Sequence, residues 1–77
     1  MKICRTIDHA LYPRDAIHAA DSAYKGCCVA KIFPLDADMT RLELTVLPEY
    51  ENNARAILLG FLNFALDKAA EMVLQDV

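Results

Sequence analysis

The chain has 77 residues, of which 56% are hydrophobic, and its net charge at pH 7 is −3. This length leaves room for one hydrophobic core, so we expect a single α+β domain over residues 1–77. The apolar fraction is too high for a disordered chain. The basic residues are scattered along the chain without interleaved aromatic side chains, which argues against nucleic-acid binding.

Three cysteines, Cys4, Cys27 and Cys28, occur in a chain whose first residues lack the apolar segment of a secretory signal. An odd number of cysteines in such a chain predicts free thiols in a reducing compartment, and we expect a cytoplasmic protein. The longest apolar-rich stretch, 56–66, is interrupted by Gly60 and Asn63 and is too short to span a bilayer. No membrane partner is therefore expected.

The first predicted elements are a strand and a helix. Lys2–Asp8 alternates imperfectly between apolar and polar residues, as a strand does. A helix is expected to open at Tyr12, with Pro13 in its first helical position. Gly26 is expected to end this helix in the left-handed conformation.

Two more strands are predicted after this helix. Cys27–Phe33 is apolar on both sides, which suits a strand covered on both faces or by a partner. Arg41–Leu47 alternates clearly, with Leu42, Leu44 and Val46 on one face. The short polar loop between them predicts an antiparallel hairpin.

A long helix is predicted from a cap at Asn52 or Asn53 to about Gln75. Its apolar arc is about twice as wide as the arc that packing on one sheet requires. The surplus predicts a partner, most simply a second copy of the chain. The residues predicted to form this interface lie on the two sides of the arc: Ile57 and Phe64 on one side, and Leu59, Leu66 and Val73 on the other.

Together these elements predict a two-layer β-α-β-β-α sandwich, in which a three-stranded sheet carries both helices on one face. The pattern leaves open whether the first strand pairs with the second or the third. An open edge in so small a sheet could accept an extended peptide by strand addition.

No catalytic, cofactor or metal site is predicted. Adjacent strand residues such as Cys27 and Cys28 point to opposite faces, and neither His9 nor His18 has a ligand at chelating spacing. Glycine-rich nucleotide-binding patterns do not occur. Spacing by four residues aligns Asn63, Asp67 and Glu71 in a strip on the long helix. That strip is either the solvated side of the helix or a polar contact surface.

Several segments resemble the HxsD family, the small His-Xaa-Ser system protein, over roughly Tyr12 to Leu74. The similar segments are Tyr12–Ile17 followed by Ala19-Ala20, then Cys27–Ala30, then Gly60–Asp67 with its Asn and Asp four residues apart. Asp21 stands where the family has an aromatic residue, and Glu71 stands where a basic residue is common. The chain is thus similar to a divergent member.

The resemblance implies an accessory role beside a radical SAM enzyme that modifies a His-Xaa-Ser repeat peptide, and it assigns no catalytic residue. We therefore expect a non-catalytic adaptor that binds a peptide or a partner enzyme and forms a homodimer. Two alternatives stay open. One is a small thiol-dependent enzyme or redox protein that uses Cys27 or Cys28, and the other is a purely structural homodimeric subunit.

Overall fold

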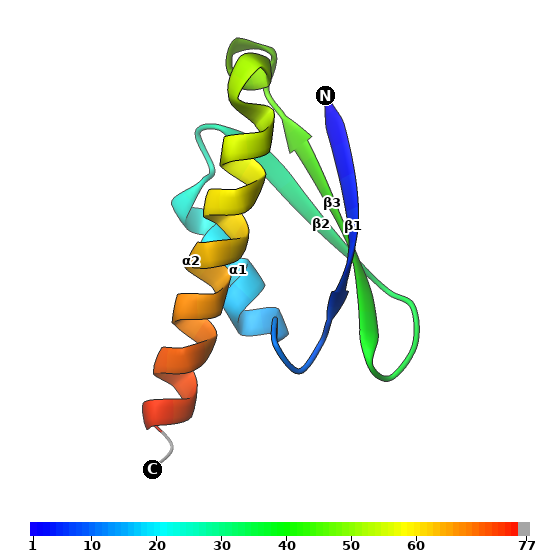
Figure 1. The fold of residues 1–77 in the computed structure, drawn as a ribbon, viewed down its shortest axis with the longest axis vertical. Coiled ribbons are helices and arrows are strands. Elements are labelled where there is room, and N and C mark those ends of the chain that lie inside the picture. Colours follow the sequence, from blue (N-terminus) through cyan, green and yellow to red (C-terminus); the bar gives the residue numbers. More distant parts are fainter. Residues whose placement is uncertain (76–77) are drawn as a thin grey trace.

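The computed structural model describes residues 1–75, and its elements follow the predicted order (Figure 1). The strands are β1 (Lys2–Asp8), β2 (Cys28–Pro34) and β3 (Met39–Val46), and the helices are α1 (Arg14–Ala23), the 3₁₀ helix η1 (Pro48–Asn53) and α2 (Ala54–Gln75). Both α-helices pack on one face of the sheet. The predicted small α+β fold is confirmed.

The sheet has three strands in the order β1-β3-β2, and both pairings are antiparallel. β1 therefore pairs with the third strand of the chain, a point that the alternation had left open. The central place suits β3, because Leu42, Leu44 and Val46 are at most 1% exposed and form the inner face. β1 and β2 run parallel to each other with β3 between them, and each forms an edge of the sheet.

The core lies between the inner face of the sheet and the two helices. α2 contributes Phe61 and Ala65, which are fully buried, and α1 contributes Ile17, which is 2% exposed. Tyr24, which follows α1, makes edge-to-face contacts with Phe61 and Phe64 at 5.9 and 6.3 Å between ring centroids. Such aromatic pairs stabilise beyond the area that they bury, so they fix α2 against α1.

Two predicted helix signals act differently in the structure. Pro13 has an extended ψ of 156° and precedes the first helical residue, Arg14, so it is the N-cap and not the first helical position. α1 ends at Ala23, with Tyr24 as its C-cap. Gly26 does not adopt a positive φ. The predicted left-handed stop is wrong, because Tyr24 already terminates the helix by accepting N–H bonds from Cys27 and Cys28.

The start of α2 and the strand limits also differ slightly from the prediction. η1 ends at Asn53 and α2 begins at Ala54, so the chain enters α2 from a helical turn and not from an extended asparagine cap. β2 and β3 are displaced by one to two residues from the predicted ranges. Strand ends depend on ladder hydrogen bonds, which alternation alone does not reveal.

The domain is elongated, with extents of 41 × 25 × 15 Å. Its accessible surface of 5160 Å² exceeds the roughly 4,700 Å² expected for a compact monomer of 8.6 kDa. In α2 the last buried residue is Ala65, and the part of the helix beyond it exposes Leu66, Val73 and Leu74 by 38%, 67% and 73%. The surplus apolar surface predicted for the long helix is therefore present.

Candidate functional site

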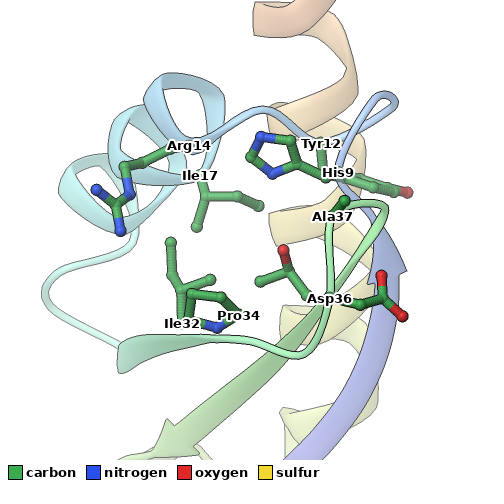
Figure 2. Close-up of a pocket in the computed structure, with 9 residues that line it drawn as sticks. His9, Tyr12, Arg14, Ile17, Ile32, Pro34, Asp36 and Ala37 are labelled. Atoms are coloured by element: carbon green, nitrogen blue, oxygen red, sulfur yellow. The ribbon is translucent and has the colours of Figure 1, made fainter.

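A cavity of about 330 Å³ lies where α1 begins and the β2–β3 hairpin turns (Figure 2). Its lining is partly apolar and partly polar: His9, Tyr12, Arg14, Ile17, Ile32, Pro34, Asp36, Ala37 and Thr40. Neither its position nor its lining was predicted. The lining residues come from two stretches of the chain, 9–17 and 32–40, so no single local sequence pattern could have identified them.

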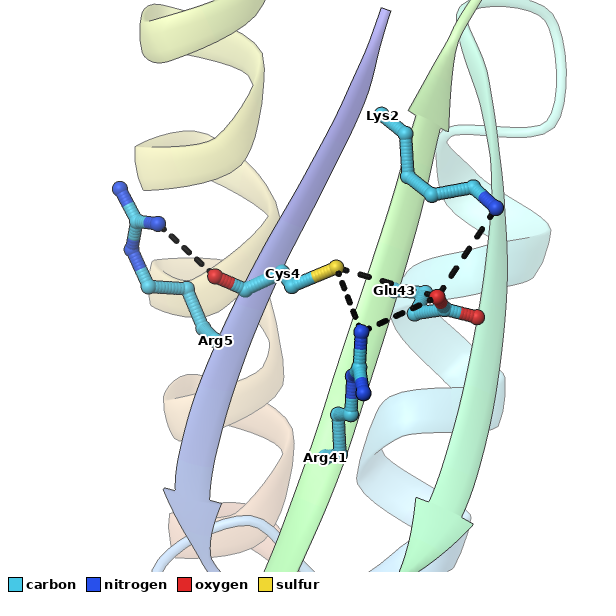
Figure 3. A network of polar contacts seen from close by, with 5 residues as sticks. All are labelled: Lys2, Cys4, Arg5, Arg41 and Glu43. Carbon is cyan, nitrogen blue, oxygen red and sulfur yellow. Dashed lines mark hydrogen bonds and ion pairs between the residues drawn. The ribbon is translucent and has the colours of Figure 1, made fainter.

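The outer face of the sheet, which neither helix covers, carries a polar cluster around Glu43 (Figure 3). Glu43 Oε1 lies 3.8 Å from Lys2 Nζ and 3.5 Å from Arg41 Nη2, and Cys4 Sγ lies 3.4 Å from the same guanidinium nitrogen. Exposed ion pairs of this kind contribute little to stability. The same face also carries two exposed apolar side chains on β2, Val29 at 48% and Phe33 at 43%.

The β2 edge of the sheet is partly closed to a further strand, because two of its outward N–H groups already have acceptors within the domain. The N–H of Ala30, which points away from β3, donates to Asp21 Oδ1 in α1 at 3.2 Å, and the N–H of Cys28 donates to the Tyr24 carbonyl. Pro34, at the end of the strand, has no N–H to donate. Among residues 1–75, the N–H of Ile32 and the carbonyls of Cys28, Ala30 and Ile32 have no hydrogen-bond partner, so this edge offers an incoming strand one N–H donor where β1 offers three.

The β1 edge is open by comparison. The N–H of Val46 donates to the Met1 carbonyl at 2.7 Å, which makes Met1 and Val46 a hydrogen-bonded pair of the antiparallel ladder. Because such pairs alternate, Ile3, Arg5 and Ile7 also bond to β3. The intervening residues Lys2, Cys4 and Thr6 must direct their backbone groups outward.

Only some of these outward groups have partners. Arg5 Nη1 donates to the Cys4 carbonyl at 2.9 Å, and the N–H of Tyr12 donates to the Asp8 carbonyl. Among residues 1–75, no partner contacts the N–H groups of Lys2, Cys4 and Thr6 or the carbonyls of Lys2 and Thr6. We call this row of backbone groups the β1 edge. It presents the donor and acceptor pattern that an extended chain requires.

An apolar strip lies on the same side of the domain. We call Leu59, Leu66 and Val73 the α2 flank; their exposures are 54%, 38% and 67%. Figure 3 shows α2 behind β1 and α1 behind β2. Tyr24 fixes Gly60 and Phe64 toward α1, and the flank lies roughly 100° to 180° around the helix from those two residues. The flank therefore faces away from α1, on the side of the β1 edge.

The other predicted interface residues lie elsewhere. Ile57 and Phe64 are partly buried and pack against the core, and the Nζ of Lys68 lies 5.6 Å from the centre of the Phe64 ring. Ile57 and Phe64, one side of the predicted interface, are therefore packed within the domain itself. Asn63, Asp67 and Glu71 are exposed, and Glu71 forms an ion pair with Lys68 at 3.2 Å. Of the two sides of the predicted interface, the α2 flank is exposed, while Ile57 and Phe64 pack against the core.

The cysteines differ in their surroundings. Cys28 is 1% exposed, and burial, followed by the nearby Cys27 and Asp21, raises the pKa of its thiol above the ordinary value of 9.0. A raised pKa reduces the fraction of thiolate, the form that acts as a nucleophile.

Within residues 1–75 no group of three His, Cys, Asp or Glu side chains is placed to hold a metal ion. No helix in that range is long and apolar enough to cross a membrane.

The contrast between the two sheet edges was missed at the sequence level. Asp21 was noted only as a departure from the resembled family, and Pro34 directly follows the predicted strand Cys27–Phe33. Had β2 been known to be an edge strand, Pro34 would have suggested that this edge was protected from strand addition.

No family model, curated protein or solved structure matches this chain.

Proposed function

We propose that this chain is a non-catalytic adaptor that binds an extended segment of a partner by strand addition at the β1 edge. The observation that carries the proposal is the set of outward N–H and carbonyl groups on Lys2, Cys4 and Thr6 that have no partner among residues 1–75. Main-chain hydrogen bonds would supply affinity, and alternate side chains of the added strand would supply selectivity.

The α2 flank would supply the apolar part of the same surface. An added strand would continue the sheet beyond β1, and its inward side chains would lie toward Leu59 and Leu66. An extended segment with apolar residues among its inward side chains fits this arrangement; in a His-Xaa-Ser repeat, every second Xaa would face this way. The resemblance to the HxsD family adds a chemical identity for the partner, namely a His-Xaa-Ser repeat peptide or the radical SAM enzyme that modifies it.

The exposed α2 flank also supports homodimer formation, as an alternative function for the same surface. An exposed apolar strip on so small a domain marks an association site. Two copies could pair their β1 edges antiparallel about a two-fold axis and bring their flanks together. In that arrangement the backbone groups of the β1 edge would be hydrogen-bonded to the second copy, so the edge would not bind a peptide.

A synthetic peptide of His-Val-Ser repeats tests the adaptor proposal. We expect the backbone N–H groups of Lys2, Cys4 and Thr6 to become protected from hydrogen exchange when the peptide binds, as measured by NMR. Thr6→Pro removes an outward N–H without breaking the ladder to β3, so this variant should lose binding, while Thr6→Val keeps the N–H and should retain it.

The outcomes are distinct for each function. Protection at the β1 edge in the absence of peptide, together with a dimeric mass in sedimentation, would favour the structural homodimer. Peptide binding that Thr6→Pro leaves unchanged would place the site elsewhere and refute strand addition at β1.

A further inference from the structure

The cavity at the start of α1 lies apart from the β1 edge and has an apolar floor. Ile17, which is 2% exposed, and Ile32, which is partly buried, form part of its wall together with Pro34 and Ala37. Its volume of about 330 Å³ is within the range of small-ligand sites. Such a floor would hold the apolar body of a small molecule.

Thr40 places a hydroxyl without a protein hydrogen-bond partner in this wall. The residue is 7% exposed and lines the cavity, and among residues 1–75 its hydroxyl makes no hydrogen bond. No fully enclosed side-chain oxygen or nitrogen in that part of the chain lacks a partner, so the open side of this hydroxyl is the cavity itself. A ligand oxygen in the cavity could therefore form a hydrogen bond with the Thr40 hydroxyl.

The start of α1 is a second unsatisfied feature of the wall. Its N-cap is Pro13, whose side chain makes no capping hydrogen bond. The Pro13 carbonyl accepts the N–H groups of Ala16 and Ile17, which leaves the N–H groups of Arg14 and Asp15 without a cap. The first turn of a helix favours a negative charge; the exposed Asp15 supplies one there, and a ligand anion would add a second.

Arg14 and Asp36 are the charged side chains of the lining, and of the two only Arg14 could pair with an anion. Arg14 and His9 are exposed on its rim, and Arg14 forms no ion pair within residues 1–75; Figure 2 shows the Arg14 guanidinium at the outer edge of the lining, beyond Ile17 and Ile32. Asp36 is the acidic residue of the lining, but its Oδ1 accepts the N–H groups of Asp38 and Met39 at 2.8 Å. Figure 2 shows this carboxylate turned away from the centre of the cavity.

We propose that the cavity binds a small monocarboxylate with an apolar body. The guanidinium of Arg14 matches a planar carboxylate in geometry and charge, the Thr40 hydroxyl would donate to a ligand oxygen, and the floor at Ile17 would contact the apolar body. One arginine without an ion-pair partner suits a single negative charge better than a doubly charged phosphate.

Benzoate is a suitable probe, with benzamide as its uncharged isostere and inorganic phosphate as an anion without an apolar body. We expect benzoate to shift the amide NMR signals of Arg14, Ile17 and Thr40 in the intact chain, and to bind about tenfold more tightly than either comparison molecule. Arg14→Gln should weaken benzoate binding by a similar factor, about tenfold. Arg55→Gln removes an exposed arginine on α2 and should leave it unchanged.

Thr40→Val removes the hydroxyl while conserving shape, and we expect it to weaken benzoate binding, with a folded-state spectrum confirming that the domain is intact. Equal affinity for benzoate and benzamide would refute the charge recognition, and equal affinity for phosphate would refute the apolar floor. Shifts that persist unchanged in Arg14→Gln, or the absence of any shift at the cavity, would overturn the proposal. None of these measurements involves the β1 edge, so their outcome is independent of the test of the adaptor proposal.

Discussion

Asp21 in α1 accepts a hydrogen bond from the backbone N–H of Ala30 in β2, with 3.2 Å between Oδ1 and the nitrogen. This single contact joins a helix to the edge of the sheet and occupies a donor that an incoming strand would otherwise use. It is one of the contacts that make the β2 edge less accessible than the β1 edge, and it leads to a first prediction.

Asp21→Ala should lower the free energy of unfolding by about 1 kcal/mol, because it leaves the partly buried Ala30 N–H without its acceptor. Asp21→Asn keeps a carbonyl oxygen in place and should lose less. Urea denaturation gives the stability change, and hydrogen exchange at Ala30 should accelerate in the alanine variant. Unchanged exchange at Ala30 would show that this contact does not protect the edge.

Gly60 lies against the side chain of Tyr24, and a Cβ placed there would come 2.5 Å from the Tyr24 hydroxyl oxygen. Gly60→Ala should therefore destabilise the domain by about 1–3 kcal/mol, although alanine favours a helix more than glycine does. Tyr24→Phe removes the clashing oxygen, so the double variant Gly60→Ala, Tyr24→Phe should recover part of the loss. Thermal unfolding of the single and double variants measures this coupling.

Gly26→Ala is the matched control for this prediction. A Cβ at Gly26 would meet no atom within 4 Å, and the backbone there does not have a positive φ. The substitution should be neutral or stabilise the domain by up to about 1 kcal/mol, through the unfolded chain. A large loss of stability at Gly26 would contradict the helix end described above.

Leu66→Asp places a charge on the α2 flank, where Leu66 is 38% exposed. We expect the free energy of unfolding to change by no more than about 0.5 kcal/mol in the isolated domain, while any self-association through the flank is lost. Asn63→Asp adds the same charge on the polar strip and should leave association unchanged. Sedimentation velocity across a concentration series separates the two, and an identical size distribution for wild type and Leu66→Asp would rule out the flank as a dimer seam.

Cys28 should be the slowest of the cysteines to react with iodoacetamide near neutral pH, since it is 1% exposed and burial raises its pKa. Mass spectrometry of the labelled chain gives the rate at each position. Fast labelling of Cys28 in the folded protein would support the thiol-dependent alternative. Uniformly slow labelling of Cys4, Cys27 and Cys28 would eliminate that alternative.

The same pKa shift predicts a dependence of stability on pH. Below the ordinary thiol pKa of 9.0, Cys28 is protonated in both the folded and the unfolded chain, so it adds no pH dependence. Above that pH the unfolded chain ionises while the buried thiol does not, so the free energy of unfolding falls as pH rises. Cys28→Val lacks this contribution and should lose stability less steeply between neutral and alkaline pH, as measured by urea denaturation.

Local periodicity determined most of the fold. The alternation of Leu42, Leu44 and Val46 identified β3, and those residues are the inner face of the central strand. Helical spacing likewise placed Leu59, Leu66 and Val73 together on α2, where they remain exposed. These features follow from side-chain directions within one element, which repeat every two residues in a strand and every 3.6 in a helix.

Only the tertiary structure decided which surfaces remain open. The strand order put β1 at an edge, and the contact from Asp21 to Ala30 occupied a donor on the opposite edge. Tyr24 packs against Phe64, so this residue of the predicted interface is already in contact within the domain. Each of these outcomes depends on contacts between separate elements. Their free energies arise only when the chain is folded, so no repeat within a single segment contains them.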